Sequence, residues 1–153
     1  MTQGDVLKKE REKRGLSLEE TANRLGISSS EYSNLETGNS PVEDWGFRLA
    51  QAAITLETPT SRLLTDSGRS RDCRPGQAGE LIRRHRERRG KSKEEMAAAM
   101  GISVEEYERV ETGGSPIETF GPLLLAFAET IEQPVFNLFY PCGLPYRELE
   151  DYP

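Results

Sequence analysis

Residues 17–38 read SLEETANRLGISSSEYSNLETG, and this stretch decides the fold of the chain. Ser17 and Ser28 are each followed three residues later by a glutamate. That spacing is typical of a capping box, in which a serine and a glutamate satisfy free backbone groups at the start of a helix. Gly26 lies between the two segments and suits the left-handed conformation that ends many helices. The stretch therefore predicts two short helices joined by a tight turn.

The same pattern returns later in the chain, where residues 92–113 read SKEEMAAAMGISVEEYERVETG. A constant shift of 75 residues, without a gap, carries Ser17 onto Ser92 and Ser28 onto Ser103. The match continues on both sides of this stretch, and it is far longer than chance would give. Two copies of one small domain are the simplest interpretation.

Further helix signals flank this pair in each copy. In the first copy a charged segment ends at Gly15, and Pro41 and Pro59 each begin a segment with apolar residues on one face. No run of residues shows the sustained alternation of a strand. We therefore expect an all-α chain of two tandem five-helix domains joined by a flexible linker. The expected bounds are 4–66 for the first domain, 67–78 for the linker, 79–141 for the second domain and 142–153 for a C-terminal tail.

Charge and hydropathy narrow the class of protein. The 153 residues include 20 Lys and Arg against 26 Asp and Glu, so the net charge is -6. This balance argues mildly against nucleic-acid binding, although the position of charges matters more than their sum. The longest apolar run, residues 123–128, is far shorter than the roughly 20 residues of a membrane-spanning helix. With no apolar signal segment at the N-terminus, a cytoplasmic protein without membrane contact is expected.

Metal, cofactor and enzyme chemistry find little support in the sequence. Cys73 and Cys142 are too few for a disulfide scaffold or a zinc site, and His85 is the only imidazole. Neither a Gly-rich phosphate loop nor a nucleophile with a nearby base occurs. We expect no enzymatic activity, no metal and no cofactor, and a redox pair of the two cysteines is a minor alternative.

The central helices have helix-turn-helix spacing, with a small residue where the helices meet and a glycine in the turn. The second of them has the pattern Ile-Ser-x-x-x-Tyr-x-x-Leu-Glu-x-Gly from Ile27 to Gly38. In these features the sequence closely resembles the lambda-repressor-like, Cro/C1-type (XRE) helix-turn-helix family. The resemblance extends over nearly the whole chain outside the linker and the tail, and it implies a DNA-binding fold.

The resemblance also implies an ion pair inside each copy. In this family an arginine of the first helix commonly pairs with the glutamate at the end of the third. Arg11 with Glu36, and Arg86 with Glu111, occupy these places. Two solvated surface charges of little energetic value are the alternative. The recurrence of both residues in both copies favours the partly buried pair.

DNA contacts are likewise implied for the third helix, which in this family enters the major groove. Short hydroxyl and amide side chains occupy the matching positions of the first copy and can hydrogen-bond base edges and phosphate oxygens. These residues are Ser28, Ser29, Ser30, Ser33 and Asn34, followed by Asn39 and Ser40 in the next loop. Leu18 departs from the family, which often has a phosphate-contacting Gln at the start of the second helix.

The second copy has an acidic surface at the matching positions. Its residues there are Val104, Glu105, Glu108 and Arg109, with Glu106 alongside. Each carboxylate facing DNA would cost on the order of 1 kcal/mol through Coulomb repulsion at a few ångströms. The second copy is therefore expected to have lost DNA reading and to serve in packing or dimerisation.

Positive charge in the linker offers a further DNA contact. Arg69, Arg71 and Arg74 stand in a segment expected to be exposed, where they could follow a phosphate backbone without sequence specificity. The basic residues of the first helix in each copy are equally well explained as solvated faces balanced by glutamates.

Two functions remain open at this point. The first is a sequence-specific DNA-binding transcriptional regulator that reads double-stranded DNA mainly through the third helix of the first copy, with a homodimer supplying a second half-site. The second is a protein-interaction module that keeps the helix-turn-helix fold without DNA, with a protein partner at the second copy. The pI near 5.0 and the glutamates of the second copy support the second function. The uncharged reading positions of the first copy favour the first.

Overall fold

The computed structural model describes residues 2–132, and all regular structure in this range is helical. The helices of the first copy are α1 Gln3–Lys13, α2 Leu18–Leu25, α3 Ser29–Glu36, α4 Val42–Leu56 and α5 Thr60–Leu64. A short 3-10 helix, η1 Ser70–Asp72, precedes α6 Gln77–Arg88, α7 Lys93–Met100, α8 Val104–Glu111 and α9 Ile117–Ile131. The predicted all-α class is thus confirmed. The fifth helix expected in the second copy and the tail at 142–153 lie outside the described residues.

Reciprocal capping boxes begin α2, α3, α7 and α8, as predicted. Ser17 Oγ accepts a hydrogen bond from Glu20 N at 3.0 Å, and Ser17 N donates to Glu20 Oε1 at 3.1 Å. Gly26 then ends α2 with a φ of 75°, a conformation that strains other residues. Because these contacts are local, they fix where α2 and α3 begin and end, and with that the turn between them.

The first and third helices of each copy approach closely, and a glycine makes this possible. A Cβ added at Gly4 of α1 would lie 2.3 Å from the carbonyl oxygen of Glu36 in α3. A Cβ added at Gly79 of α6 would lie 2.1 Å from the carbonyl oxygen of Val110 in α8. Any side chain at these positions would push the helices apart, so the glycines set the spacing between them.

A glutamate at the start of each fourth helix binds the N-terminus of the first helix. Glu43 Oε2 accepts a hydrogen bond from Gly4 N at 2.8 Å, and Glu43 Oε1 accepts one from Gln3 N at 3.2 Å. Glu118 at the start of α9 accepts a bond from Gly79 N, the repeat equivalent of Gly4, at 2.9 Å and another from Gly76 N, which precedes α6, at 2.8 Å. The carboxylates satisfy backbone amides that a helix leaves free and interact favourably with its positive end.

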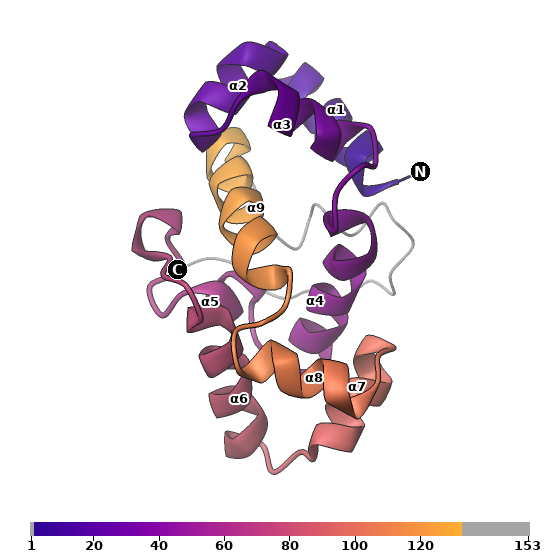
Figure 1. Ribbon diagram of the computed structural model, residues 1–153. Coiled ribbons are helices and arrows are strands. Elements are labelled where there is room, and N and C mark those ends of the chain that lie inside the picture. The colour runs from indigo at the N-terminus through magenta and orange to yellow at the C-terminus, as the bar shows by residue number, and fades with distance from the viewer. Residues whose placement is uncertain (1, 133–153) are drawn as a thin grey trace.

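Beyond this start, the fourth helix of each copy crosses over to the other copy. α4 packs against α7, and α9 packs against α2. Figure 1 shows α9 rising to α2 while α4 descends to α7. One core of buried side chains consequently extends through both copies. The two copies are therefore joined by packed helices, in addition to the connecting segment.

The connection between the copies differs from the expected flexible spacer. η1 lies against α9, where Ser70 N donates a hydrogen bond to Glu129 Oε2 at 3.0 Å. Cys73 is half-buried and packs against the core. The sequence of this segment is polar, and a polar composition alone favours a flexible linker. In the structure the carboxylate of Glu129, far away in the chain, gives the backbone of this segment a hydrogen-bond partner.

Candidate nucleic-acid interface

The side chains of α3 divide into a buried face and an exposed face. Tyr32 and Leu35 are buried in the core. Ser29, Ser30 and Asn34 are exposed on the helix. This division follows from the helical period, which sends residues three or four apart to the same side. Glu31 is exposed as well, and its carboxylate accepts a hydrogen bond from Ser28 N at 3.1 Å as part of the helix cap. Apart from this carboxylate, the exposed face presents short, uncharged hydrogen-bonding groups to solvent.

The other residues predicted at this surface bond groups within the protein or are half-buried. Ser28 Oγ caps α3 by accepting a hydrogen bond from Glu31 N at 3.1 Å. Ser33 is half-buried, and so is Ser40, whose Oγ accepts from Val42 N at 3.3 Å. Asn39 is exposed, and its Nδ2 donates to Thr37 Oγ1 at 3.3 Å. Each hydroxyl or amide keeps further hydrogen-bonding capacity. Ser28 and Asn39 are exposed like Ser29, Ser30 and Asn34, whereas Ser33 and Ser40 are less accessible.

Arg11, on α1, and Glu36, the last residue of α3, form a largely buried ion pair. Arg11 Nε donates to Glu36 Oε2 at 2.6 Å, and Arg11 Nη2 donates to Glu36 Oε1 at 3.2 Å. A third bond, from Arg11 Nη1 to the carbonyl oxygen of Leu16 at 2.8 Å, reaches the loop before α2. The side chains are only 10% and 8% exposed, and the hydrogen bond to Glu36 raises the pKa of Arg11. One guanidinium thus ties the end of α1, the start of α2 and the end of α3 together.

The second copy repeats this arrangement with its own pair. Arg86 Nε donates to Glu111 Oε2 at 2.6 Å, and Arg86 Nη1 donates to the carbonyl oxygen of Lys91 at 3.0 Å. The side chains are 11% and 6% exposed. The structure therefore brings together both pairs that the sequence analysis named.

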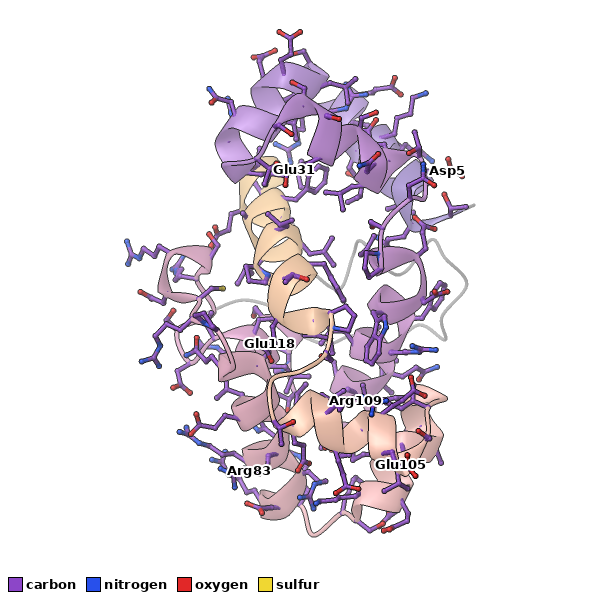
Figure 2. All side chains as sticks on the ribbon, in the orientation of Figure 1. Asp5, Glu31, Arg83, Glu105, Arg109 and Glu118 are labelled. Atoms are coloured by element: carbon purple, nitrogen blue, oxygen red, sulfur yellow. The ribbon has the colours of Figure 1, made fainter. Side chains whose placement is uncertain are left out.

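α8 presents charge where α3 presents neutral groups. Figure 2 shows Glu105 and Arg109 on α8, and both residues are exposed, as is Glu108. Val104 is half-buried and packs against the core, so it contributes little to the outer face. Lys93 Nζ lies 3.7 Å from Glu108 Oε2. This lysine, at the start of α7, is the repeat equivalent of Leu18.

Basic residues elsewhere differ in how far they are neutralised. On α6, Arg83 pairs with Glu87 at 2.9 Å and Arg84 pairs with Glu80 at 2.7 Å. The arginines of the connecting segment are exposed, namely Arg69, Arg71 and Arg74. The connecting segment therefore keeps accessible positive charge, as the sequence suggested.

Leu18 is 37% exposed and is the only large hydrophobic residue exposed to this extent among residues 2–132.

The imidazole of His85 lies in a pocket of about 350 Å³. Burial is the main cause that lowers the pKa of His85, and the neighbouring Arg89 and Arg88 lower it further. Arg89 Nη1 is 3.3 Å from His85 Nδ1. The charged residues that line the pocket are Glu57, Arg62, Asp66, Arg84, Arg88 and Arg89. The surroundings favour a neutral imidazole beside several guanidinium groups.

The described residues offer no support for metal or thiol chemistry. Within residues 2–132 no cluster of His, Cys, Asp and Glu side chains could hold a metal ion. Burial raises the pKa of the Cys73 thiol to about 11, which disfavours the reactive thiolate. Cys142, its suggested redox partner, lies outside the described residues. In the same range, no helix is long and apolar enough to cross a membrane.

Comparison with known families adds one finding to this geometry. The family model of the helix-turn-helix domain matches the chain twice, over residues 4–63 and again over residues 77–130. No curated protein and no solved structure matches the chain.

Proposed function

The chain belongs to the helix-turn-helix domain family, and on that premise we propose that it is a sequence-specific transcriptional regulator of XRE type. It binds double-stranded DNA, and α3 of the first copy reads the base edges in the major groove. The helix-turn-helix domain indicates a DNA-binding regulator in general. The choice of α3 as the reading helix rests on the chemistry of the two exposed faces.

The contrast between α3 and α8 is the observation that supports this choice. Ser29, Ser30 and Asn34 are exposed and neutral, and each can donate or accept a hydrogen bond at a base edge. On the repeat-equivalent face α8 has exposed Glu105 and Glu108, and the single exposed Arg109 does not offset both carboxylates. A carboxylate about 4 Å from a phosphate charge is repelled by about 1 kcal/mol even in water. DNA therefore approaches α3 at a lower electrostatic cost than α8.

A selection from a pool of randomised duplexes tests the proposal. The affinity of the selected duplex should fall steeply with salt, because bound cations are released from the phosphates. Asn34→Ala and Ser30→Ala should each reduce the preference for the selected over a scrambled duplex by about 1 kcal/mol. The matched change on the other copy, Glu105→Gln with Glu108→Gln, should keep the preference or raise general affinity. A loss of preference in the glutamine variant, with Asn34→Ala unaffected, would make α8 the reading helix.

The second candidate function is a protein-interaction module that uses α8. The exposed carboxylates Glu105 and Glu108 support it, because they suit a basic protein surface better than a phosphate backbone. If the selection yields no duplex with salt-dependent binding, this function replaces the first. Binding of the identified partner should then weaken in the Glu105→Gln, Glu108→Gln variant and remain unchanged in Asn34→Ala.

Dimerisation belongs to the same proposal. A homodimer would place a second α3 on DNA and read a second half-site one helical turn away. The stoichiometry of the complex with the selected duplex, measured by light scattering, distinguishes one chain per site from two.

A further inference from the structure

The crossing of the fourth helices places a helix of the second copy under the reading helix of the first. The ring of Phe127, on α9, stacks on the ring of Tyr32, on α3, with centroids 6.3 Å apart and an interplanar angle of 13°. Tyr32 is 0% exposed and Phe127 is 1% exposed. The buried side of α3 is therefore supported by a residue from the other copy.

Side-chain size supports this crossed arrangement over one in which each copy uses its own fourth helix. At repeat-equivalent positions, α9 has Phe127 where α4 has Ala52, and α7 has Met96 where α2 has Thr21. All four residues are buried. The helix with the phenylalanine packs against the helix with the threonine, and the helix with the alanine packs against the helix with the methionine.

The uncrossed alternative would pair the residues differently. α4 with Ala52 would meet α2 with Thr21, leaving unfilled space, while α9 with Phe127 would meet α7 with Met96 and crowd it. Both underpacking and overpacking destabilise a core. These two differences between the copies are thus distributed so that each crossed pair of helices combines a larger buried side chain with a smaller one.

We propose that Phe127 is a positioning residue for DNA reading by α3, so that the DNA-binding unit is the whole chain and not the first copy alone. This inference rests on the proposed function in treating α3 as the reading helix. Phe127 itself is buried and is not placed in contact with DNA. It acts through Tyr32, whose ring it holds, and Tyr32 fixes the face of α3 that opposes Ser30 and Asn34.

The test uses the full chain with two matched variants, Phe127→Leu and Phe120→Leu. Phe120 is also a buried phenylalanine of α9, two turns earlier, in the part of the helix that begins beside α6. Amide hydrogen exchange of residues 29–36 and 104–111 is measured, together with affinity for the selected duplex. In Phe127→Leu, exchange in α3 should accelerate roughly tenfold relative to α8. Affinity for the duplex should fall by a similar factor although Ser30 and Asn34 are intact.

The control and the outcomes separate this inference from the function on which it rests. In Phe120→Leu, exchange in α3 should not accelerate more than exchange in α8. Equal acceleration of both helices in Phe127→Leu, or faster exchange in α8 alone, overturns the positioning role. Faster exchange in α3 with unchanged duplex affinity overturns it as well. If the wild-type chain binds no duplex, the proposed function fails, and the exchange data still decide whether Phe127 holds α3.

Discussion

Tyr32 of the first copy stacks on Phe127 of the second, with their ring centroids 6.3 Å apart. Near-parallel rings at this separation interact favourably beyond the area that they bury. The contact joins two residues that belong to different repeats of the sequence. It therefore links the two copies through a direct side-chain contact.

A double-mutant cycle with Tyr32→Leu and Phe127→Leu should give a coupling energy of about 1 kcal/mol, as expected for an aromatic pair in contact. Urea unfolding of the four proteins supplies the measurement. Tyr107→Leu, at the position in the second copy equivalent to Tyr32, is the control partner for Phe127→Leu. Additive losses in the Tyr32 cycle, with coupling in the Tyr107 cycle, would contradict the crossed packing.

Removal of one member of the buried ion pair should be strongly destabilising. In Glu36→Ala the Arg11 guanidinium loses both carboxylate bonds while it stays largely covered, so the free energy of unfolding should fall by about 3 kcal/mol. The exposed residue Glu12 provides the control, and Glu12→Ala should cost well under about 1 kcal/mol. Equal losses in the two variants would mean that the pair contributes no more than surface charges do.

A methyl group at Gly4 should force α1 away from α3. Its Cβ would lie 2.3 Å from the carbonyl oxygen of Glu36, and backbone cannot yield as a flexible side chain does. We expect Gly4→Ala to lower the free energy of unfolding by about 2 kcal/mol or more. A Cβ at Gly114 meets nothing nearer than 3.6 Å, so Gly114→Ala is the control and should be much milder. Thermal unfolding compares the two variants.

Stability should decline in mild acid because of His85. Its pKa is lowered from the ordinary value of 6.5 in the folded protein, chiefly by burial and then by Arg89. The unfolded chain then binds the proton more readily, so this contribution is complete above pH 6.5 and is lost as the pH falls through the folded pKa. Between pH 7 and pH 5 the melting temperature of the wild-type chain should fall more than that of His85→Gln. Parallel curves for the two proteins would refute this role.

The arginines of the connecting segment should add affinity for DNA without selectivity. Replacement of Arg69, Arg71 and Arg74 by Gln should weaken binding to all duplexes alike and flatten the salt dependence by up to roughly three units. A variant with the same change of charge on α6, Arg83→Gln with Arg84→Gln and Arg88→Gln, is the control. An equal change of slope in both variants would show an effect of net charge instead of a local contact.

The sequence by itself determined the helices, their ends and their repetition. Capping boxes such as Ser17 with Glu20 join residues three apart, and Gly26 acts through its own backbone freedom. Interactions between residues so close in the chain can be recognised from the sequence alone. The Arg11 and Glu36 pair spans 25 residues, and it was inferred from the resemblance to a family, because spacing alone does not identify such a partner.

Only the tertiary structure decided which second helix each fourth helix covers. α4 and α9 have the same apolar period, so either could cover α2 or α7 as far as the pattern shows. The choice agrees with the volumes of Ala52 on α4, which packs against α7, and of Phe127 on α9, which packs against α2. Close packing depends on the shapes of side chains across the whole core, whereas a periodic pattern of apolar residues shows their polarity and not their shape. For that reason the support that α9 gives to α3 became visible only in three dimensions.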